Sequence, residues 1–246
     1  MKINILTLFP EMFLAITESS ILGRAAANGI LEITLTNIRD FTQDKHRRVD
    51  DTPFGGGPGM VMMADPVFRA LEASGAKGKR HLYMSPRGKI LDYPMALELA
   101  REKELVMLCG HYEGVDERIL EYWDMEEISI GDYILTGGEL AAMVVVDAVA
   151  RMIQGVLGDM KSAEAESIYS GLLEYPQYTK PREYRGMEVP GVLAGGNHEL
   201  IHLWQFEQSL ALTKEKRPDL FETFVKESGN LTKKEKKILE KVVSRV

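Results

Sequence analysis

Glycine-bearing loops follow three strand-like runs of the sequence, and such loops could bind a small molecule. They are Ser85 to Gly88, Gly110 to Gly114, and Gly131 to Gly138. In open α/β sheets, ligands bind beyond the carboxyl ends of the strands, where such loops converge. One loop of this kind alone is equally well explained as a plain turn, but the three together predict a small-molecule site.

The residues around these loops favour a cationic ligand over a nucleotide phosphate. No Gly-x-Gly-x-x-Gly segment opens a helix, and the segment Phe54 to Met60 lacks the Lys-Ser/Thr that completes a phosphate loop. Glu113, Asp132 and Glu139 lie in or beside the loops. Their carboxylates would repel an anion but could offset the charge of a cation such as a sulfonium.

One other motif suggests different chemistry. His198-Glu199-Leu200-Ile201-His202 matches the H-E-x-x-H pattern, in which two histidines one helical turn apart bind zinc in proteases. A zinc protease also needs a third ligand and a cleft, and a chance match is the alternative reading. Stoichiometric zinc together with peptide cleavage would identify a protease.

The charge distribution bears on a nucleic-acid partner. The formal net charge of −7 argues against one, because phosphate contacts require Lys and Arg. However, residues 1–158 carry 16 Lys and Arg against 23 Asp and Glu, residues 159–246 carry 14 against 14, and the last 33 residues carry 10 against 6. This asymmetry is compatible with RNA binding through one end of the protein, and a solvated Lys/Glu helix face explains the same counts.

The composition indicates a globular cytoplasmic protein. The hydrophobic content of 45% over 246 residues is enough for a sizeable core. The apolar run that starts at Ile3 is too short for a signal peptide, and no stretch approaches membrane-spanning length. The single cysteine, Cys109, excludes an internal disulfide framework and lies in an apolar run, so we expect a buried and unreactive thiol.

Strand-like and helix-like runs alternate through the first 150 residues, which predicts an α/β domain on a mainly parallel sheet. The expected strands are Lys2 to Phe9, Leu31 to Ile38, His81 to Ser85, Leu105 to Cys109 and Glu127 to Ile130. The expected helices are Glu11 to Asn28, Asp65 to Ala73, Pro94 to Lys103, Glu117 to Trp123 and Glu139 to Ile153. The last of these is apolar nearly all round, so it should lie in a core or a subunit interface.

The rest of the chain divides into a long loop, a linker and a second domain. Residues 39–60 lack a periodic pattern, and loops of that length are usually functional or mobile. We predict a first domain over residues 1–157, a polar linker over residues 158–170, and an all-helical domain over residues 171–246. Thr232 and Glu235 form a capping-box pattern at the start of the last helix.

Taken together, the motifs resemble those of the bacterial tRNA guanine-37 N1-methyltransferase family, a group of knotted SPOUT methyltransferases. The resemblance covers nearly the whole chain. The matching segments are Leu8 to Phe13, Arg39 to Thr42, Val49 to Asp51, Gly55 to Met60, Asp116 to Arg118, Gly171 to Tyr178, Met187 to Pro190 and Lys216 to Pro218, in addition to the three loops.

The resemblance implies several properties that composition and periodicity do not reveal. The first domain is expected to contain a deep trefoil knot whose loops bind S-adenosylmethionine, and the protein is expected to be an obligate homodimer with active sites between protomers. The helical domain is expected to grip tRNA, and neither DNA nor a membrane is an expected partner. The donor-binding residues implied by motif match are Tyr83, Met84, Ser85, Pro86, Gly88, Gly110, Tyr112, Glu113, Ser129, Ile130, Gly131, Asp132, Tyr133, Ile134, Leu135, Gly137 and Gly138.

The resemblance also implies the catalytic pair. Arg151 matches the family's catalytic arginine, and Glu166 aligns with its general base, although the family usually has Asp there. Guanine N1 is a poor nucleophile until its proton leaves, so a carboxylate is required, and a guanidinium can stabilise the charge that spreads to O6. Without the resemblance, an ion pair of Arg151 with Asp147 and a solvated Glu166 would explain both residues.

Further implied contacts lie in the long loop. Asp50, Arg47, Arg48 and Gly56 are expected to contact the guanine and phosphates of the tRNA, and a magnesium requirement would make Glu113 an oxygen ligand. Gln154 and Ala141 stand where the family commonly has proline, and His111 where it often has arginine. Two rivals stay open: a knotted methyltransferase for ribosomal RNA, which should lack the Asp50 loop and the helical tail, and a catalytically silent RNA-binding protein.

Overall fold

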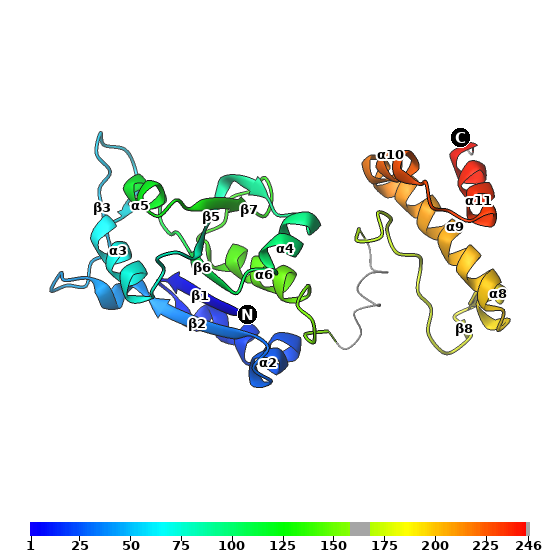
Figure 1. The fold of residues 1–246 in the computed structure, drawn as a ribbon, viewed down its shortest axis with the longest axis horizontal. Coiled ribbons are helices and arrows are strands. Elements are labelled where there is room, and N and C mark those ends of the chain that lie inside the picture. The colour runs from blue at the N-terminus through cyan, green and yellow to red at the C-terminus, as the bar shows by residue number, and fades with distance from the viewer. Residues whose placement is uncertain (158–167, 245–246) are drawn as a thin grey trace. The chain divides into compact units, whose positions relative to one another are not determined.

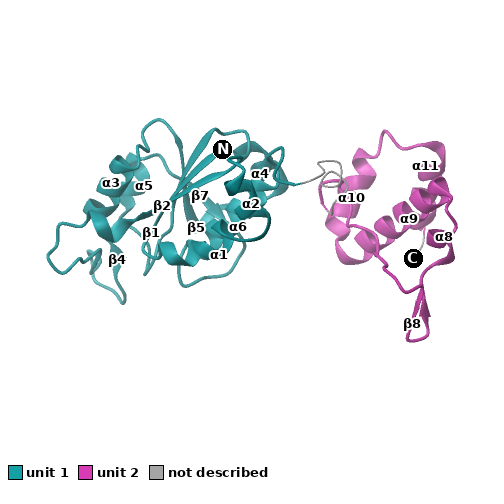
Figure 2. Ribbon diagram, turned by 90° about the horizontal axis from the view of Figure 1, so that it is seen from below, with its two compact units in different colours: residues 1–158 teal, residues 159–246 magenta. Residues whose placement is uncertain are grey.

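The computed structural model describes residues 1–157 and 168–244. The chain divides into two compact units, Met1–Gly158 and Asp159–Val246, coloured separately in Figure 2. None of the described helices combines the length and the apolar character needed to cross a membrane.

Unit 1 is built on a five-stranded sheet with strand order β2-β1-β6-β5-β7, in which every neighbouring pair is parallel (Figure 1). Its strands are β1 Lys2–Thr7, β2 Glu32–Asn37, β5 Arg80–Ile90, β6 Glu104–Leu108 and β7 Glu126–Ser129. The helices of this unit are α1 Leu14–Thr17, α2 Ser20–Ala27, α3 Ala64–Ala73, α4 Tyr93–Leu99, α5 Glu117–Tyr122 and α6 Glu139–Ala150. The predicted parallel α/β domain is therefore confirmed.

Alternate residues of the central strands pack into two separate cores. Ile3 and Ile5 of β1 belong to a core with α2, α4 and α6, whereas Leu6 belongs to a core with α3 and α5. Side chains of a strand alternate between the two faces of a sheet, so helices must cover both faces of this one. On α6, Val145 and Val149 are buried, whereas Leu140 and Val144 on its other side are exposed.

Several predicted elements differ from those observed: α4 and α6 end four and three residues before their predicted ends, and two differences are larger. The segment expected to be one helix over residues 11–28 is a 3₁₀ turn, Pro10–Phe13, followed by α1 and α2. The break falls where Ser20 has a φ of 55° and where the Thr17 hydroxyl donates to the backbone oxygen of Phe13 at 3.1 Å. Serine and threonine hydroxyls that bond to the local backbone compete with helix continuation.

β5 continues beyond the predicted end at Ser85. Its pairing with β7 shifts register, because Met84 and Lys89 both lie opposite Ile128. Residues 85–88 therefore bulge out of the ladder as a loop, and Lys89–Ile90 rejoin the sheet. An ideal Cβ at Gly88 would lie 2.2 Å from the carbonyl carbon of Glu127, so only glycine fits this return.

The long loop between β2 and α3 contains short elements. A 3₁₀ turn spans Ile38–Phe41, and β3 Asp50–Asp51 pairs antiparallel with β4 Val61–Met62. The arm between β3 and β4 carries the glycine-rich segment 55–59.

Unit 2 contains α8 Gly191–Ala194, α9 His198–Lys216, α10 Pro218–Glu227 and α11 Lys233–Ser244. Its small core consists of Leu172, Leu210, Phe221, Leu239 and Val242. The capping box is confirmed, because the backbone N–H of Thr232 donates to Glu235 at 2.8 Å. A short hairpin, β8 Glu183–Tyr184 and β9 Met187–Glu188, precedes these four helices, so the prediction of an all-helical domain was wrong in this segment.

Candidate active site

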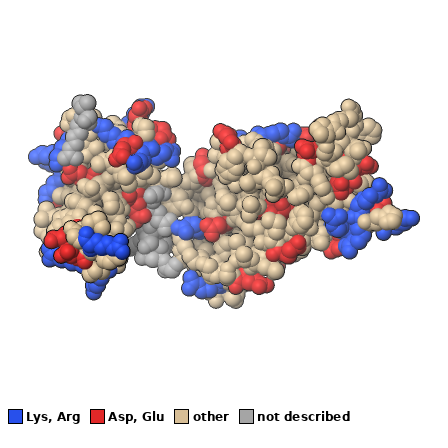
Figure 3. Space-filling model, turned by 180° about the vertical axis from the view of Figure 1, so that it is seen from behind, with Lys and Arg blue, Asp and Glu red and all other residues tan. Residues whose placement is uncertain are grey.

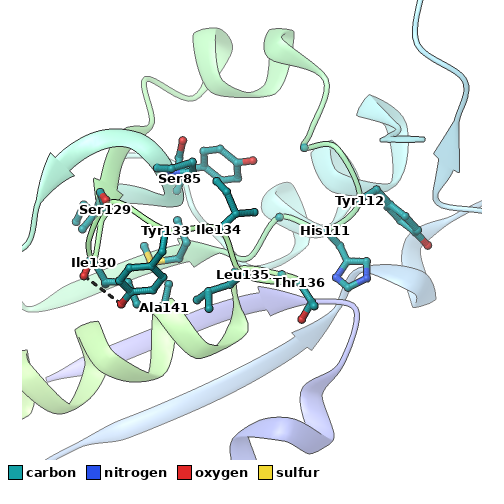
Figure 4. A pocket seen from close by; sticks show the side chains of 18 of the residues that line it. Ser85, His111, Tyr112, Ser129, Ile130, Tyr133, Ile134, Leu135, Thr136 and Ala141 are labelled. Carbon is teal, nitrogen blue, oxygen red and sulfur yellow. Dashed lines mark hydrogen bonds between the residues drawn. The ribbon is translucent and has the colours of Figure 1, made fainter. Parts of the chain in front are cut away.

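A cavity of about 260 Å³ lies at the carboxyl ends of β6 and β7 and at the bulge within β5, and these three strands are neighbours in the sheet. All three glycine-bearing loops contribute to its wall (Figure 4). Every donor-binding residue implied by the resemblance lines this cavity except Gly88 and Asp132. Gly88 instead lies against the backbone of β7, and Asp132 is exposed.

The sequence analysis missed two lining residues, Ile128 and Ala141. The other lining residues, including His111, Gly114 and Thr136, belong to the predicted loops or to the donor-binding residues that the resemblance implies. Ala141 lies three residues after Gly138, one turn along α6, so helical spacing could have revealed it.

Backbone contacts hold the three loops together. The N–H of Gly138 donates to the carbonyl of Gly110 at 2.8 Å, and His111 forms an isolated antiparallel bridge with Gly137. An ideal Cβ at Gly138 would lie 2.9 Å from the Cα of Cys109, so a side chain there would push the loops apart. The cavity thus depends on close backbone approach.

The third loop is also fixed from within. The hydroxyl of Ser129 contacts both the N–H and the carbonyl of Gly131, at 3.1 and 3.2 Å. The phenol of Tyr133 donates to the carbonyl of Ile130 at 3.3 Å, drawn as the dashed line in Figure 4. Ile134 is 80% exposed, which leaves an apolar side chain available at the cavity to a ligand.

The electrostatic environment suits a ligand without phosphate. Among the described residues that line the cavity, none is Lys or Arg, and Glu113 supplies a carboxylate. Burial, with the nearby Glu127 carboxylate, raises the pKa of Tyr83 to about 12, so its phenol stays neutral. Burial likewise raises the pKa of the Cys109 thiol, which agrees with the predicted unreactive cysteine.

Glu139 lies behind the cavity rather than in its wall. It is 2% exposed, and its carboxylate accepts from the Thr7 hydroxyl at 2.8 Å. With Phe9, Met12 and His111 it lines a smaller cavity of about 140 Å³. The sequence could not place this pair, because Thr7 and Glu139 are far apart along the chain.

The proposed catalytic and RNA-contacting residues fall in different places. Arg151 is half-buried at the end of α6, where its backbone N–H donates to the backbone carbonyl of Asp147 at 3.1 Å. Glu166 lies outside the described residues. Arg47 forms an ion pair with Asp40, and Arg48 forms one with Asp44 at 2.9 Å.

Two further loop residues lie on the β3–β4 arm. Asp50 begins β3, and Gly56 is exposed at the end of the arm. Gly59 of the arm lies against a lining residue of the cavity, because an ideal Cβ on it would lie 2.4 Å from the Glu113 carboxylate.

The sequence suggested two metal sites, a zinc site in the H-E-x-x-H segment and a magnesium site at Glu113. In the H-E-x-x-H segment, His202 contacts Glu235 at 3.0 Å and Glu199 pairs with Lys234, so both side chains face α11. Within residues 1–157 and 168–244, no group of three or more His, Cys, Asp or Glu side chains could hold a metal ion. The magnesium requirement stays a prediction.

Fold and site together define a parallel α/β protein with a glycine-walled pocket formed by loops of three adjacent strands. Residues 1–223 match the profile of the family described as tRNA (Guanine-1)-methyltransferase TrmD, and the chain belongs to this family.

Relatives from several bacteria agree with this assignment. A protein of Clostridium perfringens is 54% identical over 223 residues, which cover 90% of this chain and 94% of the relative. One from Alkaliphilus oremlandii is 51% identical over 253 aligned positions that cover both chains completely, and one from Moorella thermoacetica is 51% identical with 100% and 98% covered. Each relative is named a tRNA (guanine-N(1)-)-methyltransferase.

Proposed function

We propose that this protein transfers the methyl group of S-adenosylmethionine to N1 of guanine 37 in tRNA. The observation that carries the proposal is the convergence of three glycine-bearing loops on one cavity, in a chain of the TrmD family. The cavity wall supports a sulfonium ligand, because it combines backbone groups, apolar side chains and the Glu113 carboxylate without Lys or Arg among the described lining residues.

When bound, the donor supplies an electrophilic methyl group on a cationic sulfur. The chain's own residues must then hold it and exclude water. Tyr83, Ile134 and Leu135 offer apolar surface for this, and the backbone groups of the loops offer hydrogen bonds for an adenine ring.

Activation of guanine N1 requires removal of its proton. We assign this step to Glu166, whose carboxylate would accept the proton as general base. Arg151 would stabilise the negative charge that spreads toward O6, without reorganising, because a guanidinium keeps its charge at all relevant pH values. Glutamate is one methylene longer than the family's usual aspartate, so Glu166→Asp should retain much of the turnover.

The knot and the homodimer belong to the same proposal. The knot is proposed from the family to which the chain belongs. Exposed apolar side chains of Leu140 and Val144 on α6 support a subunit interface. Sedimentation should give about twice the mass of the 27.6 kDa chain, and Val144→Glu should reduce that mass and the activity together. A fully active monomer would exclude the dimer.

The direct test of the reaction uses labelled S-adenosylmethionine and unmodified tRNA with guanines at positions 36 and 37. Label should appear at N1 of guanine 37. When the assay is made in cells, the label should appear in the cytoplasmic tRNA pool. Label at another base, or in ribosomal RNA, would contradict the assignment. Glu166→Gln should keep donor binding and lose most of the turnover, by about 10²- to 10⁴-fold. Unchanged turnover would exclude Glu166 as the base.

A further inference from the structure

Phe54 is the most exposed large apolar side chain of the described residues, with a relative exposure of 103%. It lies on the arm between β3 and β4 and contacts water on all sides. A single exposed apolar side chain is ordinary by itself, so its surroundings decide what it can do.

The three residues that follow Phe54 carry no side chains. Gly55, Gly56 and Gly57 follow it with φ values of 87°, 78° and 129°, and an ideal Cβ on any of them would meet nothing within 4 Å. The phenyl ring is therefore presented without apolar neighbours. A protein partner normally requires a contiguous apolar patch, whereas a nucleobase can stack on one planar ring.

The arm is anchored to the wall of the donor cavity. The N–H of Glu113 donates to the Met60 carbonyl at 3.0 Å, and the N–H of Met62 donates to the Gly114 carbonyl at 2.9 Å. Glu113 and Gly114 both line that cavity. The base of the arm that carries Phe54 therefore adjoins the wall of the donor cavity.

Positive charge lies on the preceding part of the same loop. Lys45, Arg47 and Arg48 are exposed, and Figure 3 shows Lys and Arg side chains gathered at the end of unit 1 that carries β3 and β4. Arg47 pairs with Asp40 and Arg48 with Asp44, and both guanidinium groups are exposed to solvent. Exposed ion pairs contribute little to the stability of a protein. The two arginines can therefore exchange these carboxylates for phosphates of the tRNA.

We propose that Phe54 stacks on a nucleobase of the tRNA anticodon loop and thereby orients the reactive guanine toward the donor cavity. The inference rests on the proposed function, and it adds a specific residue and a specific kind of contact. Phe54 is a substrate-binding residue and takes no part in the chemical step.

The test compares four variants of the full-length protein: Phe54→Tyr, Phe54→Trp, Phe54→Leu and Phe54→Ala. Base–aromatic stacking should be lost in the Leu and Ala variants, which lowers kcat/KM for tRNA by roughly 5- to 150-fold. The Tyr and Trp variants keep a planar ring and should stay within about threefold of the wild type. S-adenosylmethionine affinity and thermal stability should be unchanged in all four variants, because the side chain is fully exposed.

A second substrate series locates the contact. Anticodon stem-loops with one abasic site at each loop position are methylated by the wild type and by Phe54→Leu. An abasic site at the position that stacks on Phe54 should lower the activity of the wild type. The same abasic site should cause no further loss of activity in Phe54→Leu, which has already lost that contact. Equal activity of wild type and Phe54→Leu on intact tRNA would overturn the stacking contact.

Other outcomes remain distinguishable. A loss of the dimer in Phe54→Ala would assign the ring to a contact between copies of the chain and would also overturn the proposal. Absence of methylation by the wild type would instead reject the proposed function itself.

Discussion

The two units achieve their structures by different means. In unit 1, the walls of the cavity depend on positions where a side chain has no room, such as Gly110 and Gly138. In unit 2, a small apolar core is flanked by exposed ion pairs between helices, including Lys241 with Glu207 and Lys234 with Glu199. An added methyl group at one of these glycines should therefore weaken ligand binding by unit 1. In unit 2, only substitutions of the few core side chains should lower the stability strongly.

The largest expected effect is on the core of unit 2. Leu210→Ala removes a completely buried side chain of α9 and should lower the free energy of unfolding of this unit by about 2–5 kcal/mol. Leu200→Ala on the same helix is the matched control, because Leu200 is 52% exposed. Urea unfolding measures both variants.

The same variant also sharpens the comparison between the units. Donor affinity should be unchanged in Leu210→Ala, because the residues that line the cavity belong to unit 1. A large loss of donor affinity would show that the pocket depends on unit 2.

The next effect is on the cavity wall. Gly138→Ala should weaken S-adenosylmethionine binding at least tenfold and destabilise the protein by about 1–3 kcal/mol, because the new methyl group would meet backbone atoms of Cys109 and Gly110. In Gly229→Ala the methyl group meets nothing within 4 Å, so this variant should bind like the wild type. Calorimetric titration measures both affinities, and equal values would show that the wall tolerates side chains.

A smaller effect concerns alkaline pH. The pKa of Tyr83 is about 12 in the folded protein, against the ordinary tyrosine value of 10.0. Between these two pH values the phenol loses its proton in the unfolded chain and keeps it in the folded protein. Stability that depends on the neutral phenol is complete below pH 10 and is lost as pH rises toward 12. The wild type should lose about 1 kcal/mol more than Tyr83→Phe between pH 9 and 11.

Urea unfolding at several pH values measures that difference. Tyr122→Phe is the control, because Tyr122 is 72% exposed. Parallel pH profiles of the wild type and Tyr83→Phe would contradict the role of burial.

The smallest effect is expected at the surface of unit 2. Lys241→Gln breaks the 2.9 Å pair with Glu207 and should change the free energy of unfolding by less than about 1 kcal/mol, because the lysine side chain is exposed. A change comparable to that of Leu210→Ala, again by urea unfolding, would mean that ion pairs stabilise unit 2 as strongly as its core does.

Local patterns account for what the sequence could predict. The strands and the glycine-bearing loops were predictable because apolar runs and turn residues act over a few neighbouring positions. The capping box of Thr232 and Glu235 was predictable for the same reason. Long-range pairing was not, as the buried contact of Thr7 with Glu139 illustrates.

Some local elements were also not predictable from the hydrophobic pattern of the sequence. The break at Ser20 arises from competing hydroxyl–backbone bonds, which hydrophobic spacing does not reveal. α9 starts at His198, because the Asn197 side chain accepts from the Leu200 N–H at 3.2 Å and caps the helix. The hairpin of β8 and β9 turns at Arg185 and Gly186, with φ values of 55° and 79°, and its strands are too short for an alternating pattern.

Hydrogen–deuterium exchange with and without saturating S-adenosylmethionine tests the central claim most directly. The donor should slow exchange of backbone amides in residues 83–88, 110–114 and 129–138, and leave the core helices of unit 2 unaffected. Protection centred on His198 to His202 instead, or none at all in the three loops, would contradict the account.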